Sequence, residues 1–290
     1  MAASVRVLDG AGMGSQRPSV HDQAATTEPE AERLLVVVAH PDDESFGCGS
    51  LLARAQAHGV RATVCCATRG EAGTSALADD RAALATIREA ELHAAADLLG
   101  VDHVVLLGWE DSDMVGPAGP GTLVAAPLEE VAAAIAAVID DVRPHIVVTL
   151  DASDGHRDHV QVREATLRAV ERARWDVPRL YLWCLARSLM EAWVRHLRSL
   201  DPTSDYLELG RLGTLDEEIT TVLDASEHYE RRWEAIRTHA SQASPYDTLP
   251  AELQWAFLAT DRLKRLRPPD TGGPLERELF TATSSASSVR

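Results

Sequence analysis

Two short clusters of histidine and carboxylate side chains stand out in the sequence. The first, residues 40–44, reads His-Pro-Asp-Asp-Glu, and the second, residues 154–159, reads Asp-Gly-His-Arg-Asp-His. Adjacent carboxylates repel one another and are costly to keep ionised unless a cation lies among them. A catalytic zinc ion takes three protein ligands of the imidazole and carboxylate type and keeps one position open for water. The two clusters therefore predict a metal centre that activates water.

Several side chains of these clusters could serve as ligand, general base or general acid: His40, Asp42, Asp43, His156, Asp158 and His159. Two histidines and one aspartate would complete the metal site, and the remaining carboxylate and imidazole could then move protons. The spacing alone does not assign these roles. The alternatives are a solvated turn at residues 40–44, whose acids favour the start of the next helix, and a polar helix-capping loop at residues 154–159.

The elements that must position these clusters alternate between strand and helix. Residues 34–39 form an apolar, β-branched run that is typical of a strand buried on both faces of a parallel sheet, and Pro41 ends it. Further strands are predicted at residues 61–67, 101–107, 144–150 and 179–185, with helices at 46–58, 79–99, 128–142 and 160–174. This rhythm predicts an α/β fold, a Rossmann-like and mostly parallel sheet with helices on both faces, in a single domain. Such sheets bind ligands at the carboxyl ends of their strands, where the first and fourth strands can be neighbours, so the clusters should meet there.

The ends of the chain differ in composition from the middle. We expect residues 1–31 to be a disordered or loosely attached arm, residues 32–267 to be the catalytic domain, and residues 268–290 to be a C-terminal tail. Within the last third, the pattern predicts a short strand at 219–223, a helix from 226 to 242 and a final helix from 250 to 265.

Composition excludes some classes of partner. The 290 residues carry a net charge of −17, which argues against binding to nucleic acid or to an anionic membrane surface. We see no bilayer-spanning apolar run and no apolar core of a signal peptide near the start. The four cysteines show no CxxC spacing, which predicts buried free thiols in a reducing cytoplasm. We expect a cytoplasmic protein that acts on a small molecule, and the sequence leaves a homo-oligomer open.

Three stretches resemble the PIG-L/LmbE-like family of zinc-dependent N-deacetylases. They are residues 39–44, the Thr-x-Gly-Glu-x-Gly of residues 68–73, and the His-x-Asp-His of residues 156–159. That family includes deacetylases of N-acetylglucosamine linked to phosphatidylinositol, and the deacetylase and amidase of the mycothiol pathway. The resemblance implies a hydrolase of linear amide bonds that removes an N-acetyl group from an amino sugar or its conjugate. It also implies one Zn2+ ion per chain, with other divalent metals left open.

The resemblance further implies a role for individual residues. The implied metal ligands are His40, Asp43 and His159. Asp42 would be the general base, His156 would stabilise or protonate the tetrahedral intermediate, and Asp158 would orient a histidine. The residues implied in substrate binding are Arg88, Asp111, His239 and Gln242.

The chain also departs from the family pattern. Asp113 replaces a glycine, Ser241 a threonine and Arg157 a proline, and Asp154 stands where mycothiol-pathway members carry a tyrosine that reaches the substrate carbonyl. A zinc amidase for a non-sugar amide and a non-catalytic binding module of the same fold remain alternatives. A dinucleotide-binding oxidoreductase is disfavoured, because residues 47–49 lack the third glycine and the preceding acids would repel a pyrophosphate.

Overall fold

The structure, a computed structural model, describes residues 31–78, 80–203, 207 and 211–280. These residues belong to one compact unit that begins at Ala31. The predicted arm lies outside the described residues, apart from Ala31 itself.

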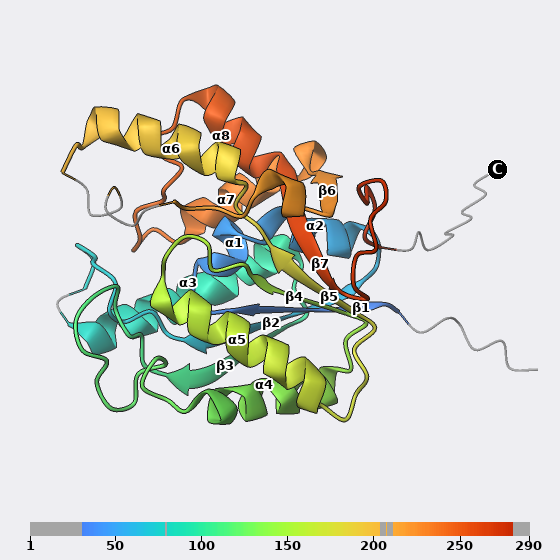
Figure 1. Ribbon diagram of the computed structural model, residues 1–290. Helices are drawn as coiled ribbons and strands as arrows, with labels where there is room; N and C mark the ends of the chain where they lie inside the picture. Colours follow the sequence, from blue (N-terminus) through green and yellow to red (C-terminus); the bar gives the residue numbers. More distant parts are fainter. Residues whose placement is uncertain (1–30, 79, 204–206, 208–210, 281–290) are drawn as a thin grey trace, which may run out of the picture. The chain divides into compact units, whose positions relative to one another are not determined.

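A seven-stranded sheet forms the centre of this unit (Figure 1). Its strand order is β3-β2-β1-β4-β5-β7-β6. The strands are β1 (Arg33–Val38), β2 (Arg61–Thr68), β3 (His103–Trp109), β4 (Ile146–Leu150), β5 (Arg179–Trp183), β6 (Thr221–Asp224) and β7 (Thr260–Arg267). Strands β1 to β5 are parallel, whereas β7 runs antiparallel to both β5 and β6. The predicted mostly parallel, Rossmann-like sheet is confirmed.

Strand β1 is the central strand of the parallel part. Leu34 pairs with Ala62 on β2 and with Ile146 on β4, so the carboxyl ends of β1 and β4 are neighbours. Successive β1 side chains enter opposite cores, with Leu34 in one and Leu35 in the other, and both are fully buried. The expectation that this strand is buried on both faces is confirmed, and the two clusters start from adjacent strand ends.

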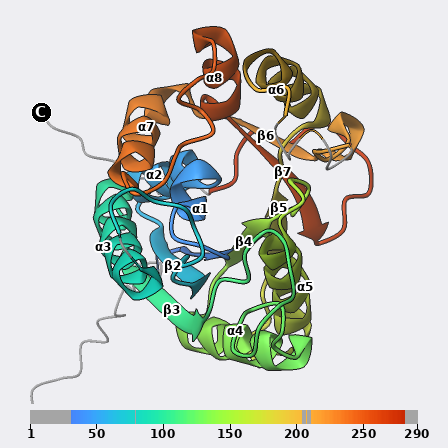
Figure 2. The ribbon, with the colours of Figure 1, turned by 90° about the vertical axis from the view of Figure 1, so that its left-hand side faces the viewer.

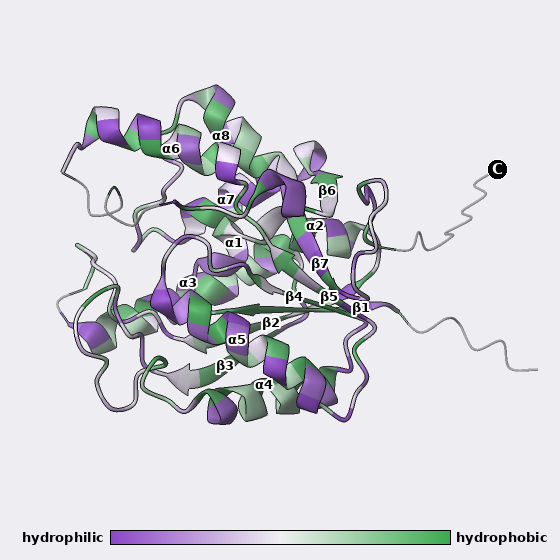
Figure 3. Ribbon diagram, viewed as in Figure 1, coloured by the Kyte–Doolittle hydropathy of each residue, from purple (hydrophilic) through white to green (hydrophobic). Residues whose placement is uncertain are grey.

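Helices cover both faces of the sheet. They are α1 (Asp43–Phe46), α2 (Gly49–Ala57), α3 (Arg81–Leu99), α4 (Leu128–Val142), α5 (Arg157–Arg172), α6 (Arg187–Leu200), α7 (Tyr229–Thr238) and α8 (Ala251–Leu258). Helices α2, α3 and α7 pack on one face and α4 and α5 on the other, as Figures 1 and 2 show. Helices α6 and α8 lie side by side at the carboxyl edge. Figure 3 shows apolar residues along the central strands and mixed polarity on α5 and α6.

The length and apolar content of the helices were compared with what a membrane span requires. Within the part of the chain that the structure describes, no helix is both long enough and apolar enough to cross a bilayer. The cysteines Cys48, Cys65, Cys66 and Cys184 are free and buried, as the sequence predicts.

Two predicted helices differ in the structure. The helix expected at 46–58 is broken into α1 and α2, because the chain passes close to the end of β4 at Gly47. A Cβ there would lie 2.9 Å from Asp43 O and 3.0 Å from the Leu150 side chain. The final helix expected at 250–265 is wrong: α8 ends at Leu258, and residues 260–267 form β7. In β7 the side chains of Asp261 and Leu263 are buried and their neighbours are not, which is the alternation of a strand.

The described part of the predicted C-terminal tail, residues 268–280, packs against the rest of the fold. Leu279 and Phe280 are buried in the same core as β1, and Glu276 forms a bridge with Thr221 on β6. The compact unit therefore continues beyond residue 267 to Phe280.

Arg232 on α7 connects distant parts of the fold. Its side chain is fully buried, donates to the backbone carbonyls of Ser45 and Gly47 at 3.3 and 3.0 Å, and also donates to that of Phe46. The Asp261 carboxylate on β7 lies 3.6 Å away. Arg232 thus holds the chain that follows the first cluster against the last strand.

We expect Arg232→Ala to lower the free energy of unfolding by about 3–5 kcal/mol, because it leaves Asp261 buried without its cation. Urea denaturation measures this change. Arg231→Ala is the matched control: Arg231 is exposed and bonds Gln56 at the surface, so we expect a change within about 0.5 kcal/mol. An equally small change in both variants would contradict the role given to Arg232.

Candidate active site

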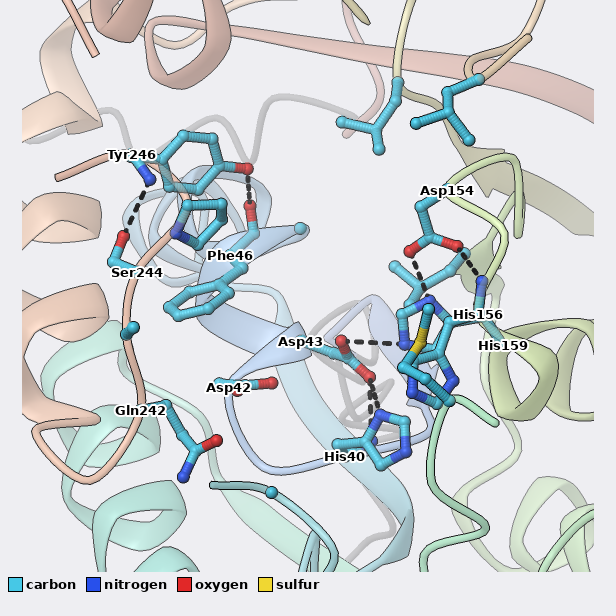
Figure 4. A pocket seen from close by; sticks show the side chains of 18 of the residues that line it. His40, Asp42, Asp43, Phe46, Asp154, His156, His159, Gln242, Ser244 and Tyr246 are labelled. Carbon is cyan, nitrogen blue, oxygen red and sulfur yellow. Dashed lines mark hydrogen bonds and ion pairs between the residues drawn. The ribbon is translucent and has the colours of Figure 1, made fainter. Parts of the chain in front are cut away.

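A pocket of about 590 Å³ opens at the carboxyl ends of β1 and β4. The lining side chains include predicted site residues from both clusters and from other segments: His40, Asp42, Asp43, Arg88, Asp111, His156, His159 and Gln242. Figure 4 shows His40 and Asp43 facing His156 and His159 across a short gap. The structure therefore brings the two clusters together, as the strand order predicts.

The carboxylates of the first cluster shape its own backbone. Asp43 Oδ2 accepts hydrogen bonds from the backbone N–H groups of Ala39 and His40, at 3.1 and 2.8 Å. Glu44 Oε2 accepts from the backbone N–H of Asp42 at 2.9 Å. Asp42 has a φ of 115°, in a region that is costly for a residue with a side chain. The surrounding hydrogen bonds hold this strained conformation at the mouth of β1.

Two histidines each have one ring nitrogen bonded to an outer carboxylate. His40 Nε2 lies 3.1 Å from Asp158 Oδ2, and His159 Nδ1 lies 2.6 Å from Asp154 Oδ2. Their other nitrogens face Asp43: His40 Nδ1 is 3.5 Å from Oδ2, and His159 Nε2 is 3.2 Å from Oδ1. Metal-ligating histidines typically show this arrangement, in which a carboxylate fixes one nitrogen and the second nitrogen binds the ion.

The electrostatics of the cluster favour positive charge. Burial alone would lower the pKa of His40, but hydrogen bonds to Asp158 and Asp43 raise it to about 10. Burial also opposes the charged form of His159, yet the charges of Asp43 and Asp154 raise its pKa well above the usual value. Burial would raise the pKa of Asp43, and the charge of His159 instead keeps it well below the usual value. The same field would attract a metal cation.

The donor atoms fit a divalent metal ion. His159 Nε2 is buried and has no hydrogen-bond partner among the described residues, although it lies next to the Asp43 carboxylate. Ligand atoms of His40, His156 and His159 lie within 4.8 Å of one another, and so do those of His40, Asp111 and Asp158. Imidazole nitrogen with carboxylate oxygen is the ligand set that Zn2+ takes in catalytic sites.

Arg88 on α3 binds Asp42. It is 3% exposed and donates to Asp42 Oδ2 at 2.8 Å, to Gly70 O at 2.6 Å and to Pro41 O. Burial raises the pKa of Asp42 to about 6, and the Arg88 charge opposes this rise. Gly70 has a φ of 66°, and a Cβ there would lie 2.4 Å from the Arg88 guanidinium. The glycine of the 68–73 motif therefore makes room for this arginine.

His239 does not reach the pocket. It is 1% exposed, and its Nε2 lies 2.7 Å from Glu44 Oε1, which also accepts from Ser45 Oγ at 2.6 Å. Burial alone would lower the pKa of His239, but the Glu44 charge raises it. The prediction that His239 binds substrate is corrected. His239 instead bonds Glu44 of the first cluster and does not line the pocket. Asp111 and Gln242 do line the pocket, and their part in substrate binding stays a prediction.

Asp158 is fully buried behind His40. Its Oδ2 accepts from His40 Nε2 and from the backbone N–H of Ser112, at 3.1 and 2.9 Å. This geometry matches an orienting role and keeps Asp158 away from the pocket surface. Asp154 has the equivalent place beside His159, which sequence reasoning missed. The available signal was its position within the same acidic, histidine-rich cluster.

His156 caps helix α5 and lines the pocket. Its Nδ1 accepts from the backbone N–H of Asp158 at 3.2 Å, so its ring proton lies on Nε2 when the ring is neutral. Burial, together with the nearby His40 and His159, lowers its pKa to about 4. The ring stacks on His159 with centroids 4.7 Å apart. His156 can therefore donate a hydrogen bond from Nε2 to a bound group.

Arg157, which replaces a proline of the family pattern, fastens the loop that follows Asp111. Its guanidinium donates to Asp113 O at 2.7 Å, to Gly116 O at 2.7 Å, to Val115 O at 3.3 Å and to Ser112 O. One side chain of the second cluster thus fixes a loop from β3.

Comparison with known proteins shows which family the chain is similar to. The family model described as PIG-L, GlcNAc-PI de-N-acetylase, matches residues 35–170. A curated relative, the 1D-myo-inositol 2-acetamido-2-deoxy-alpha-D-glucopyranoside deacetylase of Mycobacteroides abscessus, is 38% identical over 231 residues, which cover 74% of this chain and 83% of the relative.

Two solved structures share the fold at low identity. The N,N'-diacetylchitobiose deacetylase of Pyrococcus horikoshii has a TM-score of 0.52 at 19% identity and covers 82% of this chain and 84% of its own. The 4-carboxy-2-hydroxymuconate hydratase of Pseudomonas putida has a TM-score of 0.56 at 18% identity, covering 83% of this chain and 99% of its own. Because one of them is a hydratase, the fold alone does not define the reaction.

The sheet, the paired clusters and the curated relative together define an amide hydrolase built on a Rossmann-like sheet. The chain belongs to the PIG-L family, and within it to the N-deacetylases.

We expect Arg157→Ala to loosen the loop at residues 112–116, since it removes hydrogen bonds to four carbonyls. Loss of about 1–2 kcal/mol of local stability corresponds to hydrogen exchange about ten times faster there. Mass spectrometry of deuterated peptides measures it. Arg168→Ala, which removes only exposed ion pairs on the same helix, should leave the loop unchanged. Unaltered exchange in Arg157→Ala would contradict this role.

Proposed function

We propose that the chain uses one Zn2+ ion to remove the N-acetyl group from an amino-sugar conjugate. The observation that carries the proposal is that His40 Nδ1 and His159 Nε2 both face the Asp43 carboxylate, at 3.5 and 3.2 Å, while Asp42 lines the same pocket. Ligand atoms also come within 4.8 Å of one another in two other groups, His40 with His156 and His159, and His40 with Asp111 and Asp158. The second of these is less favourable, because Asp158 is fully buried and does not line the pocket.

The ligands in this proposal are His40, Asp43 and His159. Zn2+ held there would supply a water of lowered pKa and polarise the amide carbonyl. Asp158 and Asp154 keep the imidazoles of His40 and His159 in the orientation that binds it.

The remaining residues move protons and hold charge. Asp42 accepts the proton of the attacking water, and Arg88 fixes the orientation of its carboxylate. His156 donates from Nε2 to the amide oxygen as negative charge develops on it, since its Nδ1 is occupied by the backbone. The leaving amine then takes from Asp42 the proton that this carboxylate accepted from the water.

The substrate class rests on the relatives and on the rim of the pocket. The curated relative is named for an inositol-linked, N-acetylated glucosamine. In this chain Asp111 and Gln242 offer acceptors and a donor for sugar hydroxyls at the same opening. A zinc amidase for non-sugar amides is the alternative. The cytoplasmic location and a homo-oligomer stay predictions.

We expect purified protein to carry about one transition metal ion per chain, measured by elemental mass spectrometry. His40→Ala and His159→Ala should lose it, because each removes a ligand. Asp154→Ala should weaken metal affinity about 10- to 100-fold by freeing the His159 ring. His93→Ala, an exposed histidine on α3, is the control and should keep its metal. Normal metal content in both ligand variants would refute the assignment.

The reaction itself is tested by acetate release from the inositol-linked substrate named above and from N-acetylglucosamine. Asp42→Asn should keep its metal and lose the rate about a hundredfold or more, because an amide cannot accept the water proton. Asp43→Asn should lose metal as well as rate. If metal-loaded wild-type protein released no acetate from any N-acetylated sugar, the proposed function would be wrong; loss of metal in Asp42→Asn would exchange the roles of the two aspartates.

A further inference from the structure

The rim of the pocket carries a carboxylate that the reaction above does not use. Asp113 lines the pocket and lies in the loop that follows β3, two residues after Asp111. Asp111 is 5% exposed, and its Oδ1 lies 3.7 Å from His40 Nε2, close to the proposed metal site. The Asp113 side chain, by contrast, is 48% exposed. Asp113 therefore lies farther out than Asp111, where it meets a part of the substrate that is remote from the amide.

The backbone of Asp113 is held in a conformation that few side chains adopt. Its φ is 63°, in the left-handed region that favours glycine. Aspartate tolerates this region better than most residues, but the conformation still costs free energy and persists only where neighbouring contacts enforce it. Asp42, the proposed base, also has a positive φ. Strained residues of this kind concentrate at active sites and at sites that bind ligands.

Arg157 supplies the contacts that hold this conformation. Its Nε donates to the Asp113 carbonyl at 2.7 Å, and its other guanidinium nitrogens donate to the carbonyls of Ser112, Val115 and Gly116. One guanidinium thus fixes the backbone on both sides of Asp113. Arg157 itself does not line the pocket. It can therefore act on a ligand only through the loop that it holds.

The Asp113 carboxylate has acceptor capacity left for a ligand. Its Oδ1 accepts from the backbone N–H of Met114 at 2.7 Å, a bond that fixes the orientation of the carboxylate. The Arg81 guanidinium lies 3.9 Å from Oδ2, beyond hydrogen-bond distance. Because the two oxygens of a carboxylate offer about four acceptor positions, Asp113 can accept hydrogen bonds from hydroxyl groups of a bound substrate. The same charge would repel an anionic group at this place.

We propose that Asp113 is a specificity-determining residue, held in place by Arg157 as a positioning residue, and that it accepts hydrogen bonds from hydroxyl groups of the substituent linked to the amino sugar. The inference rests on the proposed function. It makes the substrate an N-acetylated amino sugar whose linked group is uncharged and carries hydroxyls. Asp113 stands at a glycine of the family pattern and Arg157 at a proline, and the two bond each other. The pair is therefore a feature of this chain rather than of the family pattern.

The test is kcat/KM of metal-loaded enzyme on two matched substrates. One is N-acetylglucosamine linked to myo-inositol, and the other is the cyclohexyl glycoside of N-acetylglucosamine, which has the same carbon ring without its hydroxyl groups. The preference for the inositol compound is the ratio of the two values. We expect Asp113→Asn to lower this ratio about five- to tenfold, since a neutral amide oxygen accepts from a hydroxyl more weakly than a carboxylate does. An unchanged ratio would overturn the proposal.

A second variant and a control accompany this measurement. Asp113→Gly removes the carboxylate at a backbone conformation that glycine adopts without strain, so the protein should stay folded and the ratio should fall at least as much. Asp97→Asn is the matched control: it removes one negative charge from an exposed position on α3 outside the pocket, and the ratio should stay as in the wild type. An equal fall of the ratio in Asp97→Asn would mean that net charge causes the effect and would overturn the assignment.

Arg157→Pro tests the positioning role. Arg157 is the first residue of α5, a position that accepts proline, and His156 has the extended ψ of 123° that a residue before proline prefers. The variant should keep its metal and lower the ratio about three- to tenfold through KM of the inositol compound rather than through kcat. In an Asp113→Gly background the same change should alter the ratio less than about twofold. An undiminished effect in that background, or an equal loss of kcat on both substrates, would overturn the positioning role.

A binding measurement separates this inference from the proposed function. Calorimetry with the inositol compound compares Asp42→Asn protein, which should not turn it over, with the Asp42→Asn, Asp113→Asn double variant. We expect Kd to be about five- to tenfold higher in the double variant. That result without acetate release by the wild type would support the role of Asp113 and refute the deacetylase function. Acetate release by the wild type together with equal Kd values would support the function and refute the role of Asp113.

Discussion

The structure depends on keeping a group of buried carboxylates charged at the carboxyl edge of one sheet. A buried carboxylate without a partner is costly, and four acids at this edge have a cationic or imidazole partner. Asp42 has Arg88, Glu44 has His239, Asp158 has His40 and Asp154 has His159. Asp43 alone faces two imidazoles that already bond other acids, which makes it the place where a metal cation adds most.

This constraint couples the last third of the chain to the first cluster. His239 and Arg232 both belong to α7 or its end, yet their side chains bond Glu44 and the carbonyls of residues 45–47. Both are at most 1% exposed. These contacts hold the segment that follows Asp42, whose backbone is strained, against α7 on the same face of the sheet. The backbone that carries the first cluster is therefore held in part by α7 and the residue that follows it.

Sequence reasoning found the parts of this arrangement that are local. The apolar run before His40 predicted a doubly buried strand, and the clusters after two such runs predicted a shared site, because strand ends of a parallel sheet meet at one edge. Contacts set by distant packing were harder to predict. The resemblance implied that Asp158 orients a histidine but did not identify it as His40, 118 residues away, and the contact of Glu44 with His239, 195 residues away, was missed. For the same reason His239 was expected at the substrate, whereas packing places it against Glu44. Arg88 lines the pocket as well as bonding Asp42, and its part in substrate binding stays a prediction. Strand β7 was misread because its pairing partners β5 and β6 also lie far away in sequence.

The two halves of the pocket come from different parts of the chain, and this division has a consequence for the family. The clusters follow β1 and β4 within the region that the family model covers. Most of the large aromatic side chains that line the pocket lie outside that region: Trp183, Trp193, Tyr246 and Phe257. A hydratase shares the fold at a TM-score of 0.56, so the sheet tolerates different chemistry at its edge. At this edge the acids are paired with cationic or imidazole side chains, so a change of one partner leaves a buried charge exposed to a large penalty. The aromatic and aliphatic side chains that line the rest of the pocket are not bound by such ion pairs, and hydrophobic surfaces accept substitution of similar volume at small cost. Substrate preference can therefore change in this region while the reaction at the strand ends stays the same.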